Sequence, residues 1–222
     1  MDKVYKTSRI MAYVLAAIAL LGIVPLVNGI VRDEISQKYN LDLDTQDYEV
    51  WQENWDAYEA ECQSDTAANI LGTTSIILFY LSIACIYVGV FLFFLLLKKN
   101  MSKGSRLTPT IILGLVSPIL CVVFLLLGRY TSISFWCAET TWRNILYIVS
   151  ALMLFATFAT MTRFLPHGTV RLSGIILTLI IVVYWAQHLF YFIEGIMGLV
   201  LPAIIYPLAF AFFYFEFSKL KK

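Results

Sequence analysis

Charged side chains are scarce in this chain. They make up 14% of its 222 residues, whereas a soluble domain carries about 25%. Histidine is rarer still, with two residues, and the four cysteines form no C-x-x-C pair, so a thiol oxidoreductase has little support. The net charge of +1 and the lack of a basic stripe interleaved with aromatic residues argue against nucleic acid as a partner.

Catalytic motifs are missing as well. The chain contains no H-E-x-x-H, no G-x-S-x-G and no phosphate-binding P-loop. It has no acidic cluster at cytoplasmic membrane depth, where a metal-dependent lipid transferase would need one. The two histidines, His167 and His188, fall in segments expected on opposite faces of a membrane, so they cannot share a zinc or haem site. We expect no cofactor and no metal, and the sequence leans away from an enzyme.

Apolar residues are abundant instead, at 60% of the chain. They come in blocks of about 20 residues or more, the length that crosses a bilayer as a helix. Backbone polar groups in lipid must be bonded within their own segment, so these blocks are helices. We predict an all-α membrane protein, a six-span transmembrane helical bundle that forms one domain over residues 1–222, with both termini cytoplasmic. The spans are expected at about 10–31, 70–97, 107–127, 144–164, 172–193 and 196–217.

Two parts of this bundle have alternatives. Three basic residues precede the first apolar run, as in a secretory signal, but the run is longer than the usual 7–15 residues and lacks an A-x-A ending. We expect it to stay uncleaved, whereas a mature chain beginning at Ile30 would have five spans. The last two spans are separated by Glu194-Gly195. We expect a tight hairpin there, and the alternative is one span followed by a buried half-helix.

Acidic residues are segregated along the chain. Eleven of the fifteen lie within residues 31–68, where only Arg32 and Lys38 oppose them. With the N-terminus inside, twelve of the sixteen Lys and Arg residues fall on cytoplasmic segments, as the positive-inside rule requires. The acidic loop, 32–69, is therefore expected on the exoplasmic side. We predict an integral multi-pass protein of the plasma membrane or of another membrane with an oxidising exoplasmic side.

Within this loop the aromatic residues follow a helical pattern. Tyr48, Trp51, Trp55 and Tyr58 are spaced three or four residues apart and share one stripe, while acidic residues occupy the other faces. We predict an amphipathic helix at about 45–61, with Asp44 as its N-cap, in a small exoplasmic cap. The stripe covers the lipid surface or the protein's own bundle, or it is an interaction face that docks a partner protein steered by the acidic faces.

A disulfide is expected beside this helix. Cys62 continues the aromatic stripe, and Cys137 lies in the second exoplasmic loop. Both cysteines fall just outside the membrane on the side expected to be oxidising. We predict a Cys62–Cys137 disulfide that holds the helix over the bundle. Cys85 and Cys121 fall within predicted spans and are interpreted as small buried hydrophobic residues.

Few polar residues lie within the spans, and the clearest group is near the outer end of the fifth. Gln187, His188, Tyr191 and Glu194 form a candidate polar or ion site there. Gln187, Tyr191 and Glu194 share one side of a helix, whereas His188 lies about 120° away on ideal geometry. The alternative is an interfacial histidine followed by a water-exposed glutamate in the turn.

No residue motif identifies a family, so the functional expectation rests on layout. The leading hypothesis is a non-catalytic polytopic membrane protein that acts through protein interaction, as a complex subunit, scaffold or sensor, by way of its acidic, aromatic-striped cap. Its expected partners are the lipid bilayer and a protein partner or a second copy of the chain. The alternative is a small oligomeric transporter or channel that uses the polar site near His188 and Glu194.

Overall fold

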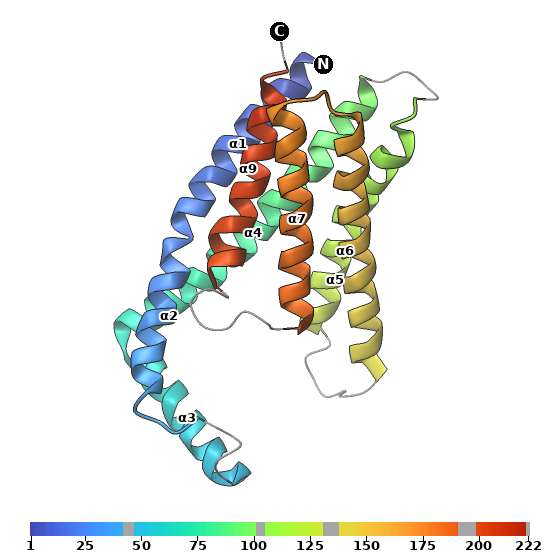
Figure 1. Ribbon diagram of the computed structural model, residues 1–222. Helices are drawn as coiled ribbons and strands as arrows, with labels where there is room; N and C mark the ends of the chain where they lie inside the picture. Colours follow the sequence, from blue (N-terminus) through green and yellow to red (C-terminus); the bar gives the residue numbers. More distant parts are fainter. Residues whose placement is uncertain (42–46, 101–104, 131–137, 191–198, 221–222) are drawn as a thin grey trace.

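The protein is a bundle of helices, seen in the computed structural model in Figure 1. The structure describes residues 1–41, 47–100, 105–130, 138–190 and 199–220, and only the backbone of 121, 124–130, 138–147 and 188–190. These described ranges contain helices and no strand. In chain order the elements are α1 (Asp2–Leu21), α2 (Ile23–Ser36), α3 (Tyr48–Ser64), α4 (Thr66–Lys99), α5 (Thr108–Tyr130), α6 (Ala138–Phe164), α7 (Thr169–Phe190), the π-helical turn η2 (Leu201–Ile205) and α9 (Tyr206–Ser218).

Four helical segments are long and apolar enough to cross a membrane. They are Asp2–Ser36, Thr66–Lys99, Thr169–Gln187 and Leu201–Ser218. Shorter apolar stretches, Thr108–Leu120 and Ile148–Phe164, lie in α5 and α6, whose side chains are described over only part of each helix. The chain is therefore an all-helical protein compatible with multi-pass insertion. α7 and α9 lie side by side and run in opposite directions, as the expected hairpin requires (Figure 1).

α1 and α2 form one rod that is interrupted at Gly22. Pro25, in the first turn of α2, has no backbone N–H to donate, and this disrupts the preceding turn. The rod lies along α9 and η2. The turn η2 has a similar origin, because Pro207 has no N–H for the carbonyl of Ala203 four residues earlier. The Tyr206 N–H bonds instead to the carbonyl of Leu201, five residues back.

The core of the bundle is an aromatic cluster that joins α4, α6 and α9. Phe93 of α4 is 2% exposed and its ring centroid lies 4.9 Å from that of Phe217 and 5.6 Å from that of Tyr214. Phe158 of α6 completes the cluster, 5.3 Å from Phe213. Most of these rings meet edge to face, the arrangement that their quadrupoles favour.

The two ends of the chain lie at the same end of the bundle (Figure 1). There the Thr169 hydroxyl donates to Glu216 Oε2 over 2.6 Å, and Lys219 Nζ contacts Glu216 Oε1 at 2.5 Å. These contacts fasten the start of α7 to the last turn of α9. The amino group of Met1 donates to Asn100 Oδ1 over 2.7 Å, which fastens the start of α1 to the end of α4.

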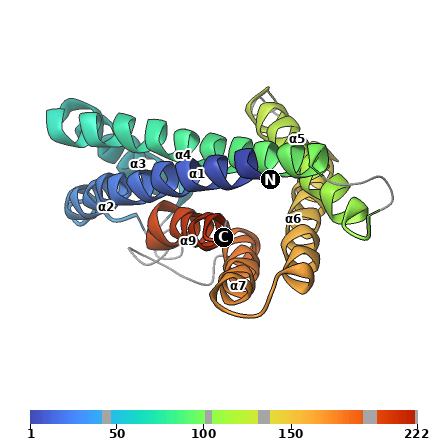
Figure 2. The same ribbon diagram turned by 90° about the horizontal axis from the view of Figure 1, so that it is seen from above.

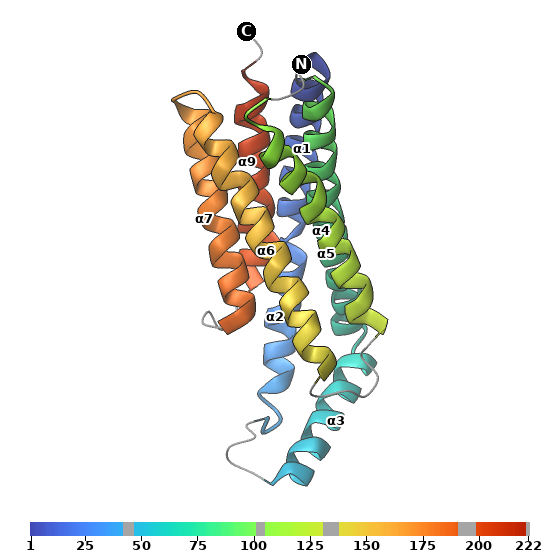
Figure 3. The ribbon, with the colours of Figure 1, turned by 90° about the vertical axis from the view of Figure 1, so that its right-hand side faces the viewer.

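α3 lies at the opposite end, but it does not cover the bundle. α2 and the start of α4 continue beyond the other helices, and α3 packs on this extension (Figures 1 and 3). Seen from above, α3 lies on the α2–α4 side, away from α5, α6 and α7 (Figure 2). The described residues therefore do not confirm the expected helix held over the bundle. The 34 residues of α4 span about 51 Å, whereas the hydrocarbon core is about 30 Å thick.

Candidate functional site

The aromatic stripe of α3 forms a continuous ladder of rings. Centroid distances are 5.9 Å from Tyr48 to Trp51, 5.6 Å from Trp51 to Trp55 and 5.6 Å from Trp55 to Tyr58. The helix runs Tyr48–Ser64, three residues later at each end than predicted. Its N-cap position is Asp47 rather than Asp44, which lies outside the described residues. The predicted spacing therefore places these four side chains together on one face.

Only part of this ladder is covered. The cover comes from α2 and the segment that follows it, which together with α3 form the α2–α3 hairpin. Tyr58 is 8% exposed and packs in a small apolar cluster with Ile35 and Cys62, whereas Tyr48 is 65% exposed. The indole N–H of Trp51 donates to the Leu41 carbonyl over 3.1 Å. The chain in and after α2 thus buries Tyr58 and partly covers Trp51. The rings of Tyr48 and Trp55 are exposed.

A polar network closes the same hairpin. Lys38 forms an ion pair with Glu61, and the Tyr39 hydroxyl donates to Glu61 Oε2 over 2.7 Å. The hydrogen bond from Lys38, followed by that from Tyr39, holds the pKa of the Glu61 carboxyl below its usual range. The hydrogen bond with Glu61 in turn raises the pKa of Lys38 and that of the Tyr39 hydroxyl. This network ties the chain after α2 to α3.

The network predicts how the hairpin responds to pH. Because folding lowers the pKa of Glu61, its contribution is complete above the ordinary value of 4.5 and is lost as pH falls through the lowered pKa. On the alkaline side the contribution is lost as pH rises through the pKa of Lys38, which is raised above 10.5. An NMR titration of the Glu61 carboxyl should give a midpoint below 4.5, and Lys38→Gln should move it upward. A wild-type midpoint at or above 4.5 would contradict the network.

Cys62 lies at the buried end of the ladder with a free thiol. The predicted Cys62–Cys137 disulfide is therefore not supported, and Cys137 itself lies outside the described residues. Burial raises the pKa of the neighbouring Tyr58 hydroxyl, a hydrogen bond with Cys62 adds to this, and the charge of Arg32 opposes it. A hydrogen bond with Arg32 also opposes it.

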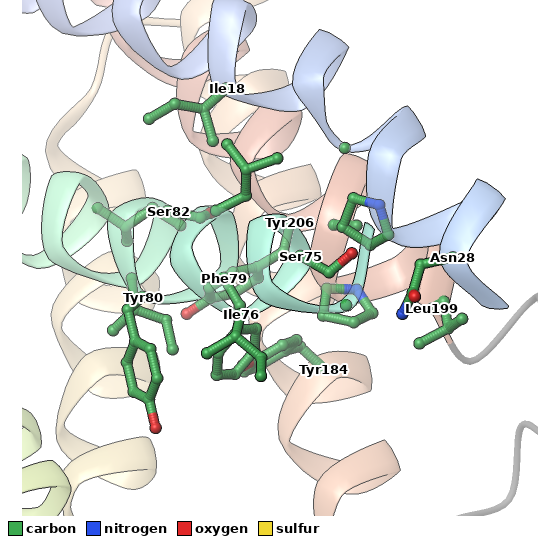
Figure 4. Close-up of a pocket in the computed structure, with 18 of the residues that line it drawn as sticks. Ile18, Asn28, Ser75, Ile76, Phe79, Tyr80, Ser82, Tyr184, Leu199 and Tyr206 are labelled. Atoms are coloured by element: carbon green, nitrogen blue, oxygen red, sulfur yellow. The ribbon is translucent and has the colours of Figure 1, made fainter. Parts of the chain in front are cut away.

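A groove opens between α1–α2, α4, α7 and η2 (Figure 4). Its volume is about 690 Å³. Its lining is largely apolar and includes Ile18, Ile76, Phe79, Leu199 and Tyr206. Figure 4 shows Ile18 toward one end and Asn28 at the other. Sequence reasoning missed this groove, because its walls come from four segments far apart in the chain.

The polar end of the groove is formed by Asn28 and Arg32, one turn apart on α2. Asn28 Oδ1 and Arg32 Nε are buried and have no hydrogen-bond partner among the described residues. Both lie over Gly72 of α4, where an added Cβ would be 3.4 Å from Arg32 Nη2 and 3.7 Å from Asn28 Oδ1. The available signal in the sequence was this i, i+4 polar pair at the outer end of the first span, opposite a glycine in the second.

The predicted polar site near the end of α7 is described only in part. Gln187 lines the groove. The side chain of His188, and Tyr191 and Glu194 altogether, lie outside the described residues. The transporter or channel hypothesis depends on those three residues and stays a prediction. In the described part of the chain no three His, Cys, Asp or Glu side chains gather as metal ligands.

Comparison with protein-family models, with curated proteins and with solved structures finds no match to this chain. Two features of its own geometry bear on its function. One is the partly covered aromatic ladder on an acidic helix. The other is the groove, at whose polar end Arg32 Nε has no hydrogen-bond partner among the described residues.

Proposed function

We propose that the chain is a six-span, non-catalytic membrane protein that binds a partner protein through the exposed rings of the α3 ladder, Tyr48 and Trp55. α5 and α6, with 23 and 27 residues, have the length to supply the two remaining spans. Twelve of the sixteen Lys and Arg residues then fall on the side of the chain ends, which makes that side cytoplasmic. α3 becomes an exoplasmic element.

The observation that carries this proposal is a rigid aromatic face left without a cover. Stacking and the Trp51 hydrogen bond to Leu41 fix the ladder before any partner arrives. Tyr and Trp presented in this way cost little conformational entropy on binding and are enriched at interface centres. The fixed ladder is therefore a preorganised docking face.

The charge around the ladder specifies the partner. Glu49, Glu53 and Asp56 are exposed on the same helix and belong to a segment that carries about nine net negative charges. Such a surface steers a basic partner and repels an anionic lipid surface. The proposed partner is a protein with an apolar patch surrounded by Lys or Arg, on the exoplasmic side. A second copy of this chain fits less well, because its equivalent surface is also acidic.

The test is site-specific photocrosslinking in the full-length protein. A photoreactive side chain at Tyr48 should yield a protein adduct, while the same group at Phe212, exposed on α9, should yield lipid adducts. Once the partner is identified, the double variant Tyr48→Ala/Trp55→Ala should weaken its binding by about 30-fold or more, as loss of roughly 2 kcal/mol at a hot spot implies. Tyr13→Ala, which removes an exposed aromatic ring on α1, should have no effect. Unchanged partner binding in the double variant would contradict the proposal.

A further inference from the structure

We infer that the groove between α2, α4 and η2 binds a zwitterionic phospholipid of the exoplasmic leaflet, with its phosphate at Arg32 and Asn28 and an acyl chain along the apolar wall. This adds a ligand site to the protein-binding role and shares with that role only the proposed orientation.

The groove has the dimensions and lining of a ligand site. Its volume of about 690 Å³ lies within the roughly 300–1,000 Å³ typical of small-molecule sites, which are mostly apolar with a few placed polar groups. Its wall is aliphatic and aromatic along the length drawn in Figure 4, from Ile18 to Leu199. A long apolar ligand is therefore favoured over a polar solute.

Two atoms at the polar end lack partners. Arg32 Nε is a donor on a charged group, buried and without an acceptor among the described residues, although the guanidinium also has a hydrogen bond with the Tyr58 hydroxyl. A buried donor of a charged group that is left without an acceptor is destabilising. A phosphate supplies acceptors to the guanidinium, which binds this group in a forked geometry. The Asn28 amide can present its oxygen or its NH2 group, so it can hold a second phosphate oxygen.

Gly72 of α4 lies beside this polar end. A Cβ added there would be 3.4 Å from Arg32 Nη2, an ordinary van der Waals distance. The Arg32 guanidinium therefore lies against α4 while the residue lines the groove. The arrangement resembles a binding end more than a surface arginine.

The depth of the groove matches a lipid. Asn28, Arg32 and Gly72 fall at the exoplasmic ends of the predicted spans 10–31 and 70–97, whereas Ile18 and Ile86 fall near their middles. An arginine at this level lies at the headgroup region, where basic residues between helices bind lipid phosphates. A ligand with one polar end at the interface and an apolar body toward the midplane is a membrane lipid.

The surrounding charge selects the headgroup. Residues 31–68 carry about nine net negative charges, which repel a headgroup that is anionic overall. A zwitterionic headgroup places its phosphate on Arg32 and its ammonium toward this acidic segment. Phosphatidylcholine satisfies both charges.

The test measures lipid binding to the full-length protein by native mass spectrometry. The probes are phosphatidylcholine, phosphatidylglycerol and diacylglycerol with the same acyl chains, and inorganic phosphate. Wild type should bind phosphatidylcholine most tightly, and Arg32→Gln should weaken it at least tenfold while leaving diacylglycerol binding unchanged. Ile76→Trp, which fills the groove from an exposed position, should weaken both lipids. Inorganic phosphate should displace neither phosphatidylcholine nor diacylglycerol.

The matched control is Lys38→Gln, which removes one positive charge from the same acidic segment outside the groove. It should leave phosphatidylcholine binding within twofold of wild type. Equal loss in Lys38→Gln and Arg32→Gln, stronger binding of phosphatidylglycerol, or displacement by inorganic phosphate would each overturn the inference. Cysteine labelling of Tyr48→Cys from outside the cell tests the orientation separately. Failure of the proposed orientation can therefore be told apart from failure of the lipid site.

Discussion

Gly22→Ala should lower the free energy of unfolding by about 1–3 kcal/mol, the usual cost of overpacking. The added Cβ would lie 2.4 Å from the Ala203 carbonyl oxygen and 2.9 Å from its carbonyl carbon. Both are backbone atoms of η2 and cannot rotate away. The α1–α2 rod must therefore separate from η2, the turn that precedes α9. α9 is the helix against which α1 packs most extensively.

Gly29→Ala is the matched control for this change. It lies on the same rod, and its Cβ would meet Leu199 Cδ1 at 2.7 Å, the end of a side chain that can change rotamer. Gly22 has helical backbone angles (φ −59°, ψ −11°) and Gly29 lies inside α2, so alanine suits the backbone at both positions. The gain in helix propensity, up to about 1 kcal/mol, is larger at Gly29, and the clash with η2 adds to the difference at Gly22. Reversible unfolding in mixed micelles measures it. Equal stability of the two variants would show that η2 moves freely.

Phe93→Ala should cost about 3 kcal/mol, at the lower end of the range for buried Phe-to-Ala changes in cores. The lower end applies because lipid is as apolar as the side chain, so packing rather than transfer from water holds membrane helices together. The variant removes the ring that meets α9 at Phe213, Tyr214 and Phe217. The expected result is looser contact between α4 and α9.

Phe212→Ala removes the same group from α9 at a site that is 39% exposed. It should cost less than about 1 kcal/mol, because a side chain that faces lipid leaves no cavity when it is truncated. Unfolding of both variants by the same micelle titration gives the comparison. A cost at Phe212 equal to that at Phe93 would mean that the cluster does not hold the bundle.

The sequence predicts some levels of this fold better than others. The three- or four-residue spacing of its aromatic residues predicts the α3 ladder. The ladder residues need only helical geometry to share a face; they are Tyr48, Trp51, Trp55 and Tyr58. The first predicted span, 10–31, covers only the apolar part of a helical segment that runs Asp2–Ser36. Apolar content marks where a helix can meet lipid and says nothing of how far the helix continues into water.

Contacts between distant segments could not be predicted. Phe93 and Phe212 look alike in the sequence because a span that is apolar all round has no periodicity to mark its core face. The pairing of Gly22 with Ala203, and of Arg32 with Gly72, depends on how helices cross. The same limit hid the groove, although Asn28 and Arg32 were each visible as polar residues at a span end.

The length of α4 has a mechanical consequence. The helix runs without a proline from α3 to the end that Asn100 links to Met1. At 1.5 Å per residue, about 40 Å of it lies between Thr66 and the Phe93 cluster, and about 9 Å between that cluster and Lys99. A tilt of α4 about the Phe93 cluster would move its α3 end roughly four times as far as its Lys99 end.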